Sequence, residues 1–227
     1  MKTHQKTGIL LLNLGGPQRL EDVRPFLVNL FSDRQIIRLG PAFLQKTIAR
    51  FIAWRRAPKS MGNYRRIGGG SPILEKTREQ ARALEAALAG DGDFVARPCM
   101  RYWHPFADRV LGEMVAAGVR ELVALPLYPH YSIATTGSSF ADLQRTMARL
   151  RLDLPVREIR DWPAAPDYIA CLAARIEEGL AGFDGEPVDL LYSAHSLPVQ
   201  FITEGDPYAL HLQQTIRAVE AVTGKQG

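Results

Sequence analysis

The chain has 227 residues, of which 46% are apolar and 23% are charged, and its formal net charge is +4 at pH 7. Such a composition is typical of a globular protein with a sizeable core, divided into one large or two small domains. The basic excess is mild and spread along the chain, which favours an anionic ligand or a membrane surface and argues against nucleic acid.

The sequence contains no recognisable signal for export or membrane insertion. The apolar stretch at residues 8–14 is too short for a signal-peptide core, and nothing approaches the ~20 apolar residues of a membrane span. Cys99 and Cys171 lie far apart without a CxxC spacing, so neither a disulfide framework nor a cysteine zinc site is indicated. A reducing cytosol is therefore the expected compartment.

The first half of the chain predicts alternating strands and helices. An apolar run ends at Gly15-Gly16-Pro17, which is typical of a strand followed by a turn. Apolar residues at helical or alternating spacing define the elements that follow. The predicted strands cover 9–14, 94–102 and 121–127, and the predicted helices cover 20–31, 41–54, 73–89 and 105–117.

The second half continues the same alternation. A helix is expected from about Thr135 to Leu150, and the last helix is expected to be capped by Asp206 and ended by Gly224. The remaining predicted elements are strands over 155–160 and 188–192 and helices over 166–180 and 208–222. Regular alternation of strand and helix predicts a parallel sheet with helices on both faces.

The helix expected over 41–54 has two interpretations. Its predicted apolar face includes Phe43, Phe51 and Ile52, and basic residues gather at its end. Cations in that position complement the helix dipole, which is the simpler interpretation. The alternative is a basic, aromatic surface that rests on a membrane.

The segment Tyr64-Arg65-Arg66-Ile67-Gly68-Gly69-Gly70-Ser71-Pro72 also has two interpretations. Ser71 and Pro72 are expected to begin the helix over 73–89. The glycines fit either a flexible linker or a backbone that a ligand approaches closely. Two adjacent arginines favour recognition of an anion, because a guanidinium pairs with a carboxylate through two hydrogen bonds. The spacing does not match a phosphate-binding P-loop.

Polar side chains follow several of the predicted strands. They are Asn13, Arg101, Tyr128, Ser132 and His195. Because the carboxyl ends of parallel strands share one edge of a sheet, these residues are expected to line one cleft. His195, in Ser193-Ala194-His195-Ser196, is the one residue of its loop that binds metals and exchanges protons near neutral pH. The alternative is a histidine that only stabilises the loop by hydrogen bonding.

Six segments, GILLLNLGGP, YRRIGGGSPI, MRYWHP, LYPHYSIATTGSSF, SAHSLP and GDPY, occur in this order. Together they resemble the ferrochelatase family, which inserts ferrous iron into protoporphyrin IX in the last step of haem synthesis. The resemblance extends from Gly8 to about Gly224. It implies two Rossmann-like parallel-sheet domains of the chelatase type, here 1–127 and 128–227, with the porphyrin between them.

The resemblance also implies roles for individual residues. His195 matches the catalytic histidine, which binds the metal, accepts pyrrole protons, or does both. The positions implied for porphyrin binding are Leu14, Arg65, Arg66, Arg101, Tyr102, Tyr128 and Ser132. The expected substrates are protoporphyrin IX and ferrous iron, with no resident cofactor and no iron–sulfur cluster in this chain. The expected location is cytoplasmic, with peripheral contact to the inner membrane through residues 41–59.

Members of the family continue beyond the helix over 208–222. The resemblance therefore implies a second domain that is incomplete at its C-terminus, without the active-site glutamate that faces the histidine. Glu204 does not match that position, and Glu220 is expected on a helix surface. We expect the chain alone to be unstable or inactive. Two other functions stay open: a ferrochelatase acting on coproporphyrin III, which the mostly apolar pocket residues disfavour, and a porphyrin-binding fragment without catalysis.

Overall fold

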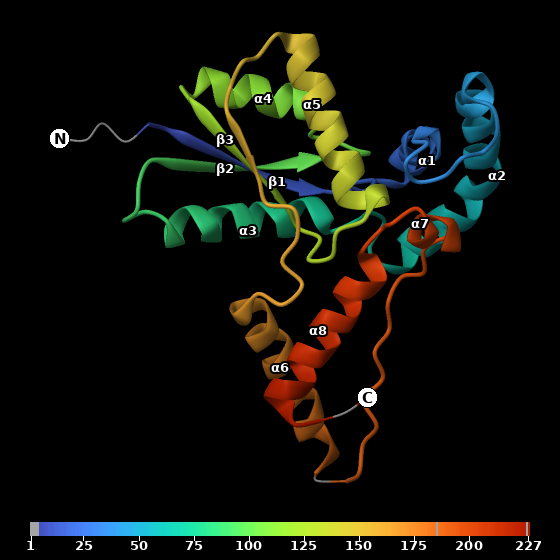
Figure 1. Ribbon diagram of the computed structural model, residues 1–227. Helices are drawn as coiled ribbons and strands as arrows, with labels where there is room; N and C mark the ends of the chain where they lie inside the picture. The colour runs from blue at the N-terminus through green and yellow to red at the C-terminus, as the bar shows by residue number, and fades with distance from the viewer. Residues whose placement is uncertain (1–4, 185, 226) are drawn as a thin grey trace. The chain divides into compact units, whose positions relative to one another are not determined.

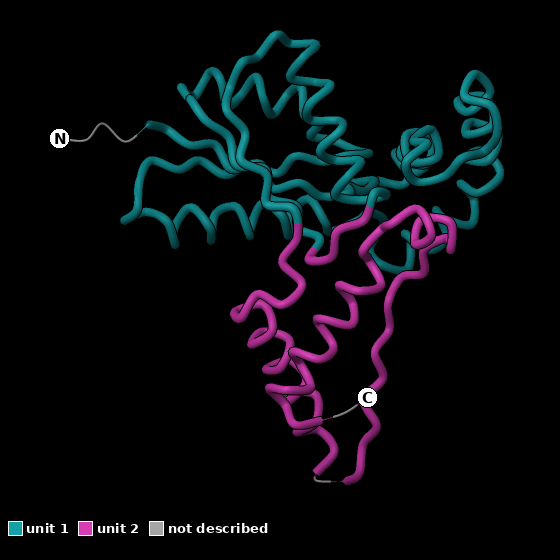
Figure 2. Tube along the Cα trace, viewed as in Figure 1, with its two compact units in different colours: residues 1–128, 133–160 teal, residues 129–132, 161–227 magenta. Residues whose placement is uncertain are grey.

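The structure is a computed structural model that describes residues 5–184, 186–225 and 227. The chain separates into two compact units (Figure 2). Unit 1 extends to Tyr128 and includes Ile133–Arg160, whereas unit 2 comprises Pro129–Ser132 and the chain from Asp161 onward. Each unit is described by itself.

Unit 1 is built on a parallel sheet with the strand order β2-β1-β3-β4 (Figure 1). The strands are β1 (Thr7–Asn13), β2 (Phe94–Met100), β3 (Glu121–Pro126) and β4 (Val156–Glu158). Leu10 of β1 lies opposite Arg97 of β2 and Ala124 of β3. Since β1 is covered on both faces, it reads as an almost continuous apolar run. The predicted α/β class with a parallel sheet is confirmed.

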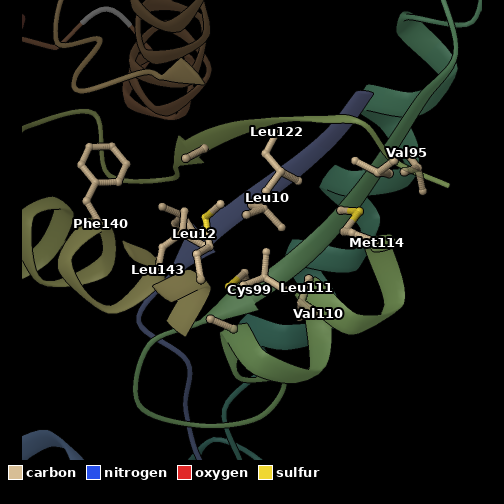
Figure 3. Packing of buried hydrophobic residues seen from close by; sticks show 14 residues of the cluster. Leu10, Leu12, Val95, Cys99, Val110, Leu111, Met114, Leu122, Phe140 and Leu143 are labelled. Atoms are coloured by element: carbon tan, nitrogen blue, oxygen red, sulfur yellow. The ribbon is translucent and has the colours of Figure 1, made fainter. Parts of the chain in front are cut away.

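Helices cover both faces of this sheet. They are α3 (Ile73–Ala87) on one face and α4 (Ala107–Ala116) and α5 (Ser138–Leu150) on the other. Helices α1 (Val23–Ser32) and α2 (Gln45–Arg66) do not cover a face but pack on each other beyond the end of the sheet (Figure 1). Leu10 and Leu12 pack with α4 and α5 (Figure 3), whereas Ile9 and Leu11 pack with Ala81 of α3 on the opposite face. Successive side chains of a strand point to opposite faces, so one apolar strand supplies both halves of the core.

Short helical turns precede three of these helices. They are 3-10 turns at Leu20–Asp22 and Ala42–Leu44 and a π-helical turn at Ile133–Gly137. The last of these leads directly into α5 and brings Ser138 to the carboxyl edge of the sheet. The helices predicted for this part of the chain are confirmed, with shifted ends.

Helix α2 differs from its prediction in length and in the face it buries. It continues through Pro58 to Arg66 because Ala49, Ala53 and Ala57 form a buried stripe that packs on α1. The bulky buried residues of α1, such as Phe26, fit against these small alanines. Of the large residues expected to be buried, Ile52 is half-buried against this cluster, whereas Phe51 lies on the outer side and is 57% exposed.

At the outer edge of β2, the three residues whose backbone nitrogens point away from β1 are Ala96, Pro98 and Met100. None of them has a free amide. The Ala96 amide donates to Glu85 Oε1 of α3 over 2.7 Å. Pro98 has no N–H, and the Met100 amide donates to the carbonyl of Pro105 over 2.8 Å. The hydrogen-bonding capacity of this edge strand is therefore largely used within unit 1.

Unit 2 consists of helices and extended connections. The helices are α6 (Pro166–Leu180), α7 (Val199–Thr203) and α8 (Tyr208–Thr223), with a 3-10 turn at Ala181–Phe183. Helices α6 and α8 pack side by side and bury Ile169, Ala173 and Val219. Gly224 ends α8 with a φ of 64°, as the sequence predicts for a terminating glycine.

Two expectations for this region are not met. Val188–Tyr192 was predicted to be a strand, but it lies in irregular coil and Leu191 is 91% exposed. A strand needs a hydrogen-bonded neighbour, and none of the described residues of unit 2 is in a strand. The second domain was also predicted to begin at residue 128. In the structure, Ile133–Arg160 belongs to unit 1 because β4 pairs with β3 and α5 packs on the sheet.

Candidate active site

The carboxyl ends of β1, β2 and β3 bring several predicted site residues to one edge of unit 1. Asn13 ends β1, Arg101 follows β2, and Tyr128 lies just beyond β3. The main chains of β1 and β2 stay paired past the strand ends, since the Arg101 amide donates to Asn13 and the Tyr102 amide donates to Leu14. Leu14 itself is half-buried against the α1–α2 cluster. The common edge expected for Asn13, Arg101 and Tyr128 is confirmed.

The Arg101 guanidinium is held by three polar partners at this edge. Its Nη2 donates to Asp33 Oδ2 over 2.7 Å, and its Nε donates to Ser138 Oγ over 2.8 Å. Its Nη1 lies 3.5 Å from Asp142 Oδ1. Only 15% of the Arg101 side chain is exposed. All three nitrogens of the guanidinium therefore face partners within unit 1.

Asp33, at the end of α1, is the centre of this network, and the sequence analysis did not identify it. Its carboxylate also accepts hydrogen bonds from the hydroxyl groups of Tyr102 and Ser138. Burial alone would raise the pKa of Asp33, but these hydrogen bonds, another from the Gln35 amide and the Arg101 charge outweigh burial. The pKa of Asp33 therefore lies below its ordinary value, and the carboxylate stays ionised.

Tyr102 and Tyr128 differ from typical ligand-contacting tyrosines in their burial. Tyr102 is 1% exposed, and its hydroxyl lies 2.7 Å from Asp33 Oδ2. Burial raises the pKa of both phenols, and the Asp33 charge adds to the effect at Tyr102. Both hydroxyl groups therefore stay neutral, and only that of Tyr102 hydrogen-bonds to its neighbours Asp33 and Ser138.

Arg65 and Arg66 occupy the last turn of α2 and are exposed. Neither side chain has a hydrogen-bond or ion-pair partner among the residues that the structure describes. Gly68 and Gly69 follow with φ of 95° and 89°, which ends the helix sharply. A side chain at Gly70 would clash with the main chain of Gln18. The close backbone approach suggested by the triple glycine is thus made by the chain itself.

His195 lies in the extended segment of unit 2, between the coil at 188–192 and α7. Its side chain is exposed, and its Nδ1 lies 2.8 Å from the Ser196 carbonyl oxygen. A carbonyl only accepts, so Nδ1 carries the hydrogen and a neutral ring has its lone pair on Nε2. Within the described part of the chain, Nε2 has no partner. The His195 main-chain amide hydrogen-bonds to the hydroxyl of Tyr208.

Ser132 and the start of α8 form a second buried cluster in unit 2. Ser132 is 1% exposed, and its hydroxyl donates to Asp206 Oδ2 over 2.9 Å. Asp206 Oδ1 accepts from the amide of Tyr208, the first residue of α8, over 3.0 Å. Asp206 was predicted to cap this helix, but Pro207 occupies the N-cap position and Asp206 bonds the first turn from one residue before it. The cluster fixes the segment that follows His195.

Two further histidines, His130 and His211, join this cluster, and sequence reasoning did not select them. His130 Nε2 lies 2.8 Å from Thr215 Oγ1, and His211 Nδ1 accepts from the Tyr131 amide over 3.1 Å. The Thr215 hydroxyl is 2.6 Å from the Pro163 carbonyl and donates to it, so His130 Nε2 must be the donor to Thr215. Burial, and then the neighbouring His211, lower the pKa of His130.

No preformed cage of metal ligands accompanies His195. Across residues 5–184, 186–225 and 227, no three His, Cys, Asp or Glu side chains gather closely enough to hold an ion. Cys99 and Cys171 are both free, the first buried in β2 and the second exposed on α6. The local chemistry around His195 is therefore that of a single exposed imidazole.

The outer face of α2 is apolar and basic. On this face Phe51 and Trp54 are each 57% exposed, with their ring centroids 6.0 Å apart. Phe43, in the turn Ala42–Leu44 just before α2, is 82% exposed. Four exposed basic residues lie in the same part of α2, namely Arg50, Arg55, Arg56 and Lys59. Of these, Arg56 lies over the ring of Phe31 in α1, 5.5 Å from its centroid. Among the described helices, none is long and apolar enough to cross a bilayer.

Comparison with known proteins gives a consistent result. The family model named Ferrochelatase matches residues 6–226. The chain is 55% identical over 221 residues to the ferrochelatase of Desulfotalea psychrophila, covering 97% of this chain and 69% of the relative. It is 51% identical over 216 residues to that of Geotalea uraniireducens, covering 95% and 67%. It is 45% identical over 225 residues to that of Gloeobacter violaceus, covering 97% and 69%. The chain spans about two thirds of the length of these relatives.

Proposed function

The chain belongs to the ferrochelatase family, enzymes that insert ferrous iron into protoporphyrin, and we propose that His195 carries the chemical step. The supporting observation is the hydrogen bond from Nδ1 to the Ser196 carbonyl, which leaves the Nε2 lone pair exposed. A backbone carbonyl in this position fixes both the tautomer and the orientation of an imidazole.

Metal insertion requires a group of this kind. A porphyrin loses two pyrrole N–H protons as the metal enters: a neutral imidazole accepts one of them as a general base, and solvent water takes the other. The same Nε2 lone pair also binds a divalent metal ion. One lone pair holds either a proton or the metal at a given moment. The two roles of His195 are therefore successive rather than simultaneous.

The propionate groups of the porphyrin are proposed to pair with Arg65 and Arg66. Both side chains are exposed and unpaired within the described part of the chain, so no internal ion pair has to break. Arg101 matches a porphyrin-binding position by resemblance, but its guanidinium is held by Asp33, Ser138 and Asp142. We propose that Arg101, whose charge is compensated by Asp33 and Asp142, fixes the end of β2, whereas the two exposed arginines bind the carboxylates.

The remaining matched positions divide in the same way. Leu14 is proposed to contact the ring, since it is half-buried at the end of β1. Tyr102 and Ser132 are each 1% exposed, so each is proposed to stabilise the matched residues of its own unit without contacting the porphyrin. Tyr128 is proposed to contact the porphyrin with its ring, because its hydroxyl is buried.

The test is metal insertion under anaerobic conditions by the chain extended to the full length of its relatives, of which it spans about two thirds. Fe²⁺ and protoporphyrin are supplied, and the Soret band is followed. His195→Ala is expected to lower the insertion rate by about 10²-fold or more, with porphyrin affinity little changed. Ser193→Ala, in the same exposed loop, is the matched control. An insertion rate in His195→Ala near that of the extended chain with His195 intact would refute the assignment.

Two readouts of the same experiment separate the alternatives. A shifted Soret band without metalation in the unmodified chain would mean porphyrin binding without catalysis. Faster turnover of coproporphyrin III than of protoporphyrin would reassign the substrate, since coproporphyrin carries four propionates and needs more cationic partners.

We further propose that the outer face of α2 rests on an anionic membrane surface. Exposed Phe43, Phe51 and Trp54 would enter the interface while the neighbouring basic side chains meet lipid headgroups. Sedimentation with vesicles containing phosphatidylglycerol is expected to carry the chain down, and neutral vesicles much less so. Phe51→Ser/Trp54→Ser should abolish sedimentation, and an unchanged bound fraction would contradict the proposal.

A further inference from the structure

A second concave site lies on unit 1 and shares no residue with the candidate active site. It is a pocket of about 270 Å³. Its apolar lining comes from Leu74 of α3, Pro98 of β2 and Pro105, and Leu74 is 6% exposed. The pocket therefore has a fixed apolar part built from the core of the unit.

The polar lining of this pocket is strongly cationic. Arg78 of α3, Arg97 of β2 and Arg109 of α4 bring three guanidinium groups from three different elements, against the single carboxylate of Glu113. His104 also lines the pocket. The sign of the charge marks the pocket as a site for an anion.

A second pocket of similar size on unit 1 does not share this excess of positive charge. It measures about 280 Å³ and is lined by Arg101 and Arg149. Asp108 and Asp142 line the same pocket, so its cationic and anionic side chains are balanced. Hollows on unit 1 are thus not cationic as a rule.

The arginines retain donors for a ligand although each has a glutamate partner. Arg109 meets Glu113 through Nε over 2.9 Å, and Arg97 meets Glu85 through Nη1 over 3.0 Å. A guanidinium has five N–H donors, so most of them stay available on both residues. The side chains of Arg109 and Arg97 are 71% and 44% exposed, and such exposed pairs are weak.

Arg78 is the least committed of the three. Its Nη1 lies 3.5 Å from Glu75 Oε2, and the same carboxylate also meets Arg82 over 3.4 Å. The single negative charge of Glu75 is shared between two arginines of α3, so it neutralises the charge of Arg78 only in part. Arg82 does not line the pocket.

We propose that this pocket binds a compact oxyanion with at least two negative charges, either a phosphate compound of diphosphate size or a small polycarboxylate. Guanidinium groups bind both kinds of oxyanion through paired hydrogen bonds. Three of them converging on one small hollow favour a multivalent ligand over a single carboxylate. The site adds a ligand to this chain beyond the porphyrin and the metal.

The test is calorimetric titration of the full chain with inorganic pyrophosphate at low ionic strength, with citrate as a parallel arm. Saturable binding is expected, and Arg78→Gln/Arg109→Gln should weaken it about tenfold or more, since charge-assisted pairs are lost. Arg145→Gln/Arg175→Gln removes the same charge from exposed helix positions outside the pocket and should leave the affinity within about twofold. Glutamine keeps the helix propensity in both variants, and circular dichroism confirms folding.

Each other outcome decides against the proposal. It is overturned by the absence of saturable binding, by equal weakening in the two double variants, or by unchanged affinity in Arg78→Gln/Arg109→Gln. It is also overturned if binding is lost only in Arg65→Gln/Arg66→Gln, because the anion would then lie at the end of α2. The tighter of the two arms identifies the ligand as a phosphate or a carboxylate compound.

Discussion

The two units differ in the polar residue that follows an extended segment: Arg101 of unit 1 is mostly buried and hydrogen-bonded, whereas His195 of unit 2 is exposed. In unit 1 the strand before Arg101 is paired with β1, and the side chain is locked to Asp33 and Ser138. In unit 2 the segment before His195 has no strand partner among the described residues, and the imidazole is exposed. The comparison teaches that a paired strand end turns a reactive side chain into a structural one.

The largest effect is expected from breaking the network of unit 1. Asp33→Ala leaves the mostly buried Arg101 guanidinium without its main partner, and loss of one member of a buried pair costs about 3–5 kcal/mol of unfolding free energy. Urea unfolding of the chain measures the change. Asp153→Ala, at an exposed position of the same unit, is the control. A loss below about 1 kcal/mol for Asp33→Ala would mean that Arg101 is not held by this network.

An intermediate effect is expected from acid, and unit 2 should respond first. The folded pKa of His130 lies below its ordinary value of 6.5, so near that pH the unfolded chain binds more protons than the folded one. Stability of unit 2 is therefore retained above pH 6.5 and falls as the pH drops through the folded pKa. For Asp33, whose folded pKa is also lowered, the corresponding loss begins only near its ordinary value of 3.8.

Hydrogen exchange of α8 and of α1 between pH 8 and 5 checks this order. Protection in α8 should decrease over that range, and protection in α1 should hold after correction for the intrinsic exchange rate. His130→Gln should flatten the pH dependence of α8. A parallel decline in both helices would show that His130 is not the responsible group.

The smallest effect is expected from Leu191→Ser. Leu191 is 91% exposed in irregular coil, so the unfolding free energy should change by no more than about 0.5 kcal/mol. Leu11→Ser, at a buried β1 position, is the contrasting variant, because it places a polar group in the core. A loss above about 1 kcal/mol for Leu191→Ser would indicate that residues 188–192 pair as a strand in solution.

Most of the elements were predictable because their patterns are local. The apolar run of β1, the helical spacing of α4 and α5, and the Asp206 and Gly224 ends of α8 all depend on nearby residues. Two predictions were wrong because they depend on packing or pairing partners that are distant in sequence. Helix α2 buries alanines because α1 supplies the bulk, and Val188–Tyr192 needs a neighbouring strand that a hydrophobic run cannot guarantee.

The candidate site divides along the same line. His195 and the two exposed arginines were found because they stand in short motifs that carry their own chemistry. Asp33 was missed because its partners are far away in sequence, Arg101 by 68 positions and Ser138 by 105. No local signal distinguishes an aspartate at the end of a helix from an ordinary capping residue, so only the fold reveals it.

Along the outer side of β2, the Ala96 amide is bonded to Glu85, the Met100 amide is bonded to the Pro105 carbonyl, and Pro98 has no amide hydrogen. A further strand, whether from this polypeptide or a neighbouring one, would find few donors there. Enlargement of this sheet is therefore directional: recruitment of additional β structure is confined to the β4 flank, where only three residues, Val156–Glu158, form the border.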